Sequence, residues 1–217
     1  MSALFESLFD IIYLISVIIL GIIIYKNAIN YEHKLFGIMA IVLGFGDSFH
    51  LVPRIISILT NDFASNIVAL GIGQMITSIT MTIFYIILYK IFKIRYNKTN
   101  TKLLDYFIYS LAFIRILLSM LPQNQWTLLN KSYSWAIYRN IPFLILGIII
   151  IILFLTETKN DKNDLYSNMW IAISLSFGFY IPVVILSPIY PLIGTLMIPK
   201  TLAYVWIVYL GYKDNKY

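Results

Sequence analysis

The residues best suited to chemistry lie close together in one apolar segment, where Asp47, His50 and Arg54 follow at i, i+3 and i+7. On a helix this spacing places the three side chains on one face. An Asp three residues before a His can fix the imidazole tautomer and raise its basicity, while the Arg holds an anion beside both. The alternative is an internal ion pair of Asp47 with Arg54 or Lys200 that only stabilises the protein. Because ionisable residues within a membrane span are functional by default, we favour the functional interpretation.

Four basic residues fall inside long apolar stretches: Arg54, Arg115, Arg139 and Lys200. A cation at mid-membrane costs about 2.5–3.5 kcal/mol on insertion scales, so four that face lipid would cost on the order of 10 kcal/mol or more. These side chains therefore either reach the interface by snorkelling or face the interior of a helical bundle, where they form a cationic cavity. Gln74 lies on a polar stripe of a neighbouring segment, which is either a helix-packing face or part of the same cavity.

The composition excludes a soluble protein. Of the 217 residues, 60% are hydrophobic and only 12% are charged, whereas soluble domains average about half apolar and about a quarter charged. Seven membrane crossings of roughly 20 residues use most of the chain and leave no room for a soluble catalytic or DNA-binding domain. The chain has no cysteine and only two histidines, so we expect no disulfide, no metal site and no cofactor.

Seven apolar stretches predict an all-α, polytopic membrane protein with seven transmembrane helices, forming a single domain over residues 1–217. They are Ala3–Tyr25, Leu35–Leu59, Ile67–Tyr89, Leu103–Leu121, Tyr133–Leu155, Leu165–Leu186 and Ile189–Tyr212. Asp47 is the only acid that this division places in the middle of a span, because Glu6 and Asp10 belong to the acidic start of the first one.

Basic residues predict the orientation of the helices, because cytoplasmic loops carry an excess of Lys and Arg. Seven helices place eleven basic residues outside the spans on one side, against only Lys131 on the other. The eleven are Lys26, Lys34, Lys90, Lys93, Arg95, Lys98, Lys102, Lys159, Lys162, Lys213 and Lys216. We therefore expect the N-terminus outside and the C-terminus in the cytoplasm, in the plasma (cytoplasmic) membrane. The net charge of +6 is explained by this bias, so nucleic acid is not an expected partner.

Glycines and prolines predict local features of the helices. Gly44 and Gly46 permit close helix approach beside Asp47. Pro142 is expected to start the fifth helix, and Pro199 is expected to kink the seventh. Pro53 and Pro182 are expected within the second and sixth helices. The four tryptophans, Trp126 among them, are assigned to the aromatic belts at the membrane interfaces.

An internal repeat is a further prediction. Ile72–Thr80 can be laid over Ile193–Thr201, and Pro53 over Pro182. With the fourth helix as an inversion linker, this gives a 3+1+3 arrangement that is similar to that of the SWEET and PQ-loop transporters. The resemblance is one of architecture and implies a small carrier.

Two other families share single features with the sequence. Gly46-Asp47 followed by a Gly-rich helix resembles the lysoplasmalogenase family, although a second helix-borne Asp of that family has no counterpart here. Seven helices with Lys200 in the last resemble rhodopsins, although Leu196 stands where microbial rhodopsins carry an acid.

Three functions follow from these residues. The first is a small transporter or binding protein for an anionic or zwitterionic solute, with Asp47 and His50 as its proton-linked element. The second is a membrane-embedded, hydrolase-like enzyme acting on a lipid, with His50 as a general base oriented by Asp47. The third is a seven-helix sensor. The partners expected are membrane lipids and an anionic small molecule or lipid headgroup, and a catalytic role is considered for His50 only under the second function.

Overall fold

The computed structural model describes residues 3–159 and 163–216, and these residues form helices and loops without any strand. Two short 3₁₀ helices, η1 (Pro122–Asn124) and η2 (Pro191–Leu196), precede the fifth and seventh α-helices. The α-helices are α1 (Ala3–Lys26), α2 (Tyr31–Thr60), α3 (Ile67–Arg95), α4 (Lys102–Met120), α5 (Tyr133–Thr158), α6 (Met169–Leu186) and α7 (Met197–Lys216).

Seven helices in the described part of the chain are long and apolar enough to cross a membrane, with η2 and α7 together forming the last. The all-helical class and the number of spans predicted from the sequence are therefore confirmed. Helix α3 continues six residues beyond the predicted end, from Tyr89 to Arg95. Hydropathy falls where charged residues begin, whereas the helix continues past that point.

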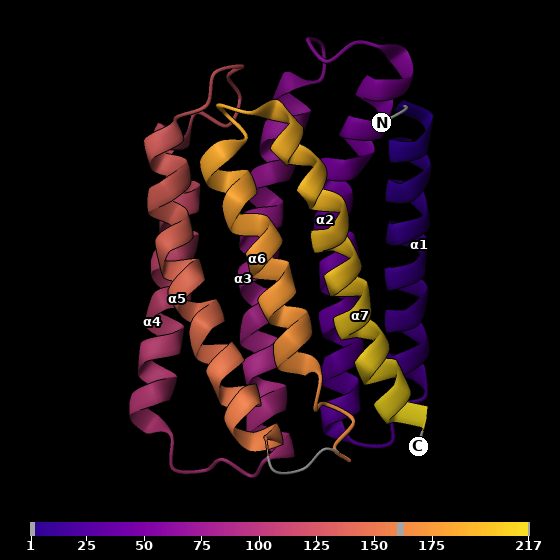
Figure 1. Ribbon diagram of the computed structural model, residues 1–217, viewed down its shortest axis with the longest axis vertical. Coiled ribbons are helices and arrows are strands. Elements are labelled where there is room, and N and C mark those ends of the chain that lie inside the picture. The colour runs from indigo at the N-terminus through magenta and orange to yellow at the C-terminus, as the bar shows by residue number, and fades with distance from the viewer. Residues whose placement is uncertain (1–2, 160–162, 217) are drawn as a thin grey trace.

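The helices form a closed ring. Each helix contacts the next one along the chain, and α7 returns to contact α1 and α2 (Figure 1). The N-terminus and the α2–α3, α4–α5 and α6–α7 connections lie at one end of this bundle, which we call the N-terminal end. The C-terminus lies at the other, the C-terminal end. Ten of the eleven basic residues used to predict orientation belong to helix ends or loops there, and Lys162 lies outside the described residues.

A layer of aromatic side chains crosses the middle of the bundle. We call Phe84, Tyr85, Phe143, Phe177 and Tyr204 the aromatic layer; all five are buried. The ring centroids of Tyr85 and Phe143 are 5.2 Å apart, those of Phe143 and Phe177 are 4.9 Å apart, and those of Phe84 and Tyr204 are 5.7 Å apart. These separations are those of favourable aromatic pairs, so the layer joins α3, α5, α6 and α7.

Two predictions about prolines were wrong. Helix α5 begins at Tyr133, after Ser132, whose side chain accepts a hydrogen bond from the Trp135 N–H, so Pro142 lies well inside the helix. Pro199 lies in the first turn of α7, where the backbone N–H groups have no helical partner and proline causes no kink. Sequence alone did not reveal that η2 supplies the first part of the seventh span.

Candidate functional site

The N-terminal half of the bundle contains a cavity of about 570 Å³. Its walls come from all seven helices, and its mouth is formed by residues of the α4–α5 and α6–α7 connections, among them Lys131, Ser132, Pro188 and Pro191. The cavity therefore opens at the N-terminal end, while Phe143 and Tyr204 of the aromatic layer form part of its floor. The seven candidate residues of the sequence analysis all line it: Asp47, His50, Arg54, Gln74, Arg115, Arg139 and Lys200.

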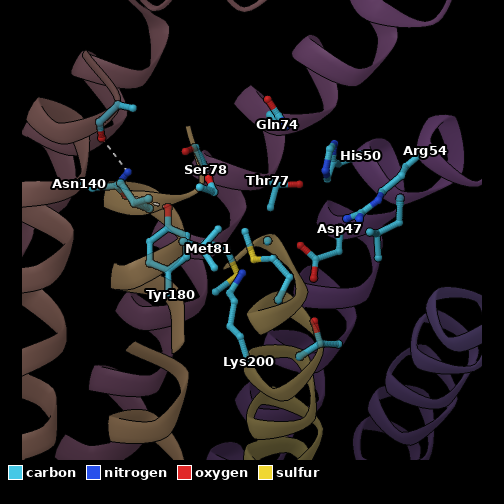
Figure 2. A pocket seen from close by; sticks show the side chains of 18 of the residues that line it. Asp47, His50, Arg54, Gln74, Thr77, Ser78, Met81, Asn140, Tyr180 and Lys200 are labelled. Carbon is cyan, nitrogen blue, oxygen red and sulfur yellow. Dashed lines mark hydrogen bonds between the residues drawn. The ribbon is translucent and has the colours of Figure 1, made fainter. Parts of the chain in front are cut away.

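Helix α2 presents Asp47, His50 and Arg54 to the cavity, as their spacing predicts (Figure 2). Small residues bring neighbouring helices close at this level. A Cβ on Gly46 would overlap the Thr80 side chain of α3, and one on Gly44 would lie 2.6 Å from Cγ1 of Ile18 in α1. The predicted close approach beside Asp47 is therefore present.

Asp47 and His50 do not form a pair in this structure. Asp47 Oδ2 accepts a hydrogen bond of 2.6 Å from the Tyr13 hydroxyl of α1. The Nδ1 atom of His50 is buried and has no hydrogen-bond partner among the described residues. Tyr13, rather than His50, is thus the residue that positions the Asp47 carboxylate.

Arg54 forms an ion pair with Glu6 of α1 rather than with Asp47. Lys200 does not pair with Asp47 either, and no described carboxylate lies within ion-pair distance of it. Its Nζ lies 5.0 Å from the ring centroid of Tyr180 and 5.3 Å from that of Tyr204. Neither of the two ion pairs considered for Asp47 is therefore present among the described residues.

Arg115 is the most deeply buried cation of the cavity, with 1% of its surface exposed. Its guanidinium carbon lies 3.2 Å from the centroid of the Phe143 ring. Its Nε and Nη1 atoms have no hydrogen-bond partner among the described residues. A cation over an aromatic face is stabilised by about 2 kcal/mol when it is removed from water, but the contact leaves these two donor atoms unused.

Arg139 reaches the cavity from α5 and is held by two neutral groups. Its Nη1 donates to Asn124 Oδ1 at 2.8 Å, and its guanidinium lies 4.3 Å from the centroid of the Trp126 ring. Trp126 is buried, and its Nε1 donates to the Ser119 carbonyl at 2.8 Å. The assignment of Trp126 to an interfacial belt was therefore wrong: it is a wall of the cavity.

Lys131 at the mouth donates a hydrogen bond to Gln74 of α3. Burial lowers the pKa of the Lys131 ammonium, and the positive charge of Arg139 lowers the pKa further. Both effects disfavour the charged form, so an anion between these two cations would relieve the repulsion between them.

Sequence reasoning missed Glu6, Asp10 and Lys131. Asp10 is buried and lines the cavity, so the acidic start of the first span is not all at the surface. Its Oδ2 atom has no hydrogen-bond partner among the described residues. The spacing of Glu6 and Asp10, one helical turn apart, was the available signal for a shared face.

A second group of charged residues lies at the C-terminal end; we call Glu32, Arg95, Asp164 and Asp214 the Arg95 cluster. Arg95 Nη1 lies 2.8 Å from Asp214 Oδ2 and 3.2 Å from Glu32 Oε1, and Nη2 lies 2.8 Å from Asp164 Oδ1. The three carboxylates come from α7, α2 and the α5–α6 connection. Arg95 therefore ties four parts of the chain together.

Further bonds support the cluster. His33 Nε2 lies 3.0 Å from Asp214 Oδ2, and the Tyr96 hydroxyl donates to Asp164. Burial alone would raise the pKa of Asp164, but the hydrogen bonds from Tyr96 and from the Tyr166 backbone N–H, with Arg95, hold the pKa below its usual value.

The donor set gives no support to a metal centre, since the described residues contain no group of three His, Asp or Glu side chains that could hold an ion.

Comparison with known proteins adds no functional assignment: no family model, curated protein or solved structure matches this chain.

Proposed function

We propose that this membrane protein binds a small anionic or zwitterionic solute in the N-terminal cavity and carries it across the membrane. The observation that carries the proposal is the charge of the cavity wall. Five basic side chains line the cavity, against three acids, Glu6, Asp10 and Asp47. The five are Arg54, Arg115, Lys131, Arg139 and Lys200.

Four of these cations, all except Arg54, have no ion-pair partner among the described residues. A cation in the membrane interior is costly, and removing a cation from water is repaid only by an opposite charge with good hydrogen-bond geometry. Arginine presents a planar fork of donors that suits carboxylate and phosphate groups. An anion that enters the cavity would supply the missing acceptors.

The cavity is accessible from one end of the bundle, and this one-sided access supports a carrier. The cavity opens at the N-terminal end, whereas the aromatic layer and the Arg95 cluster close the bundle beneath it. Carriers of the alternating-access type expose a central site to one side at a time. In this interpretation the structure is one such state, and solute release requires the Arg95 cluster to open.

Asp47 is proposed to couple solute binding to a proton. The negative carboxylate repels an anion in the same cavity, and protonation removes this repulsion. Binding of the proton and binding of the anion therefore favour each other by the same free energy, because linkage is reciprocal. The two would move in the same direction.

The excess of basic residues at the C-terminal end supports an orientation with that end in the cytoplasm and the cavity open to the outside of the plasma membrane. The predicted 3+1+3 repeat remains part of this proposal. Pro53 and Pro182 do lie within α2 and α6, while Ile72–Thr80 is α-helical and Ile193–Thr201 begins in η2.

A lipid-modifying enzyme is the second candidate, and one observation favours it: His50 lines the cavity with a buried Nδ1 that has no described hydrogen-bond partner. A general base needs such a free nitrogen. The orienting contact from Asp47 that this mechanism requires is made to Tyr13 instead, so the carrier is the stronger proposal.

The test is ligand-dependent thermal stability of the purified protein with a panel that contains inorganic phosphate, sulfate, acetate and zwitterionic amino acids. A binder at about 100 times its Kd stabilises the folded state by about 2.7 kcal/mol. We expect Lys200→Gln to abolish most of this stabilisation, and Lys90→Gln to leave it unchanged because Lys90 is exposed and lies outside the cavity. Equal responses of the two variants would contradict an anion site in the cavity.

A further inference from the structure

A second, apolar cavity adjoins the first and lies between α5 and α6. We call it the α5–α6 slot; its volume is about 140 Å³. Its walls are formed by one face of each helix, with α5 residues at i, i+3, i+4, i+6 and i+7 and α6 residues at i, i+3, i+4, i+7 and i+8. The lining residues are Ile137, Asn140, Ile141, Phe143, Leu144, Phe177, Tyr180, Ile181, Val184 and Ile185.

The slot exposes almost no polar surface, although Asn140 and Tyr180 belong to its lining. The Tyr180 hydroxyl donates to Asn140 Oδ1 at 2.9 Å, and Asn140 Nδ2 donates to the Ala136 carbonyl at 2.8 Å (Figure 2). These polar groups form hydrogen bonds within the protein, so the slot does not need water to satisfy them. Apolar cavities of about 150 Å³ stay dry and take up apolar groups.

The slot faces lipid on its outer side. Ile141 of α5 and Ile185 of α6 line it and are 48% and 42% exposed on the outside of the bundle. On a membrane-spanning helix such surfaces contact acyl chains. The slot therefore joins the wall of the cationic cavity to the lipid phase.

The inner side of the slot is the wall of the cationic cavity itself. Phe143 and Tyr180 line both spaces. On the cavity side, Arg115 lies over the Phe143 ring at 3.2 Å and Lys200 Nζ lies 5.0 Å from the Tyr180 ring centroid. The two cations and the apolar slot thus lie on either side of these two rings, so a ligand that occupies both spaces must pass beside the rings.

We infer that the ligand is an anionic amphiphile with a single alkyl chain, whose charged head lies among Arg115, Arg139 and Lys200 while its chain enters the α5–α6 slot. This inference rests on the proposed function and narrows its class of solute. The charge of the cavity fits the head, and the adjoining slot fits the chain. Because the head chemistry is shared by carboxylates and phosphates, the test contains both.

The experiment measures binding of two homologous series to the protein in phosphatidylcholine nanodiscs: alkyl phosphates that begin with inorganic phosphate, and alkyl carboxylates that begin with acetate. For the methylenes that enter the slot, we expect affinity to rise about fourfold per methylene. Ile141→Trp adds bulk at the slot and should flatten this rise, while the affinity for inorganic phosphate or acetate stays unchanged.

Ile148→Trp is the matched control, since Ile148 is a 46% exposed isoleucine on the same helix that lies outside the slot. Partition into the bilayer contributes equally to both variants, so their difference reports the slot. Leu144→Phe, which adds bulk from a less exposed position, repeats the test if Ile141→Trp does not fold.

Equal chain-length dependence in the slot variants and in Ile148→Trp would overturn the inference and would assign the chain dependence to the bilayer. Binding of the short anions with no gain from the chain would overturn it while leaving the proposed function intact. Absence of binding by every member of both series would overturn it as well, and together with no response to sulfate or the zwitterionic amino acids it would contradict the proposed function itself.

Discussion

Arg95 and Arg115 are both enclosed by helices, yet the two ends of the bundle give them different partners. At the C-terminal end Arg95 contacts three carboxylates, those of Glu32, Asp164 and Asp214. At the N-terminal end Arg115 lies over an aromatic ring, and two of its donor atoms have no partner among the described residues. The first arrangement is electrostatically complete, whereas the second lacks an anion.

This difference separates charges that hold the fold from charges that serve a ligand. A buried polar group without a partner costs about 1–3 kcal/mol, and a charged one costs more. Such a cost is usual at functional sites, where local stability is given up for binding. The comparison therefore predicts that removing charge at the C-terminal end destabilises the protein, while removing charge at the N-terminal end changes what it binds.

The largest effect is expected for Arg95→Gln. The change leaves three carboxylates close together with their common cation removed, and breaking a buried pair in this way costs about 3–5 kcal/mol. All three acids are nearly buried, with side-chain exposures of 6–9%, so water replaces little of the loss. Thermal unfolding in detergent or nanodiscs measures the change.

Arg95→Lys is the control for this variant. It keeps the charge but cannot contact carboxylates on three elements through a planar fork, so an intermediate loss of stability is expected. If Arg95→Gln unfolds at the wild-type temperature, the Arg95 cluster does not hold the C-terminal end closed, and the contrast between the two ends fails.

A smaller effect, on binding rather than stability, is expected for Asp47→Asn. The variant resembles the protonated carboxyl, so anion affinity at neutral pH should rise by the coupling free energy, typically about 1–3 kcal/mol or about 5- to 150-fold. Affinity should also depend less on pH, although other ionisable side chains of the cavity remain, among them Glu6, Asp10 and His50. Titrations at several pH values measure both.

Tyr13→Phe provides the comparison, because it removes the hydrogen bond to Asp47 while the carboxylate stays. The anion affinity of Tyr13→Phe should therefore still depend on pH. An Asp47→Asn protein with wild-type affinity and an unchanged pH profile would remove Asp47 from the proposed coupling.

The sequence was sufficient to predict the number of helices and the helical face that Asp47, His50 and Arg54 share on α2. Hydropathy identifies a lipid-crossing helix because every backbone polar group must be satisfied within the segment, and helical periodicity then places Asp47, His50 and Arg54 on one side. The cost of a charge in lipid predicts that Arg115, Arg139 and Lys200 do not face the lipid. All of these side chains line the cavity.

The partners of these residues could not be predicted, because they depend on which helices become neighbours. Arg54 pairs with Glu6 and Asp47 bonds to Tyr13 because α1 packs along α2, a contact that no local pattern encodes. Trp126 was misassigned for the same reason. Its loop folds over the cavity mouth, and a Cβ on Gly71 of α3 would overlap the Trp126 carbonyl.

The smallest effect is expected for Lys131, whose lowered pKa makes anion binding weaken at alkaline pH. Anion binding favours the ammonium, so the pKa is higher in the complex than in the free protein, and affinity falls as pH rises through the lower, free value. Across the alkaline range in which the Lys131 ammonium loses its proton, we expect a loss of up to about fivefold from this group. Lys131→Arg should reduce the loss, because arginine stays charged throughout this range. The measurement is the affinity for an anion of the panel whose own charge is constant over this range.

A pH profile of affinity that is identical in wild type and Lys131→Arg would place the ligand away from the mouth and against Arg115 and Lys200 at the floor.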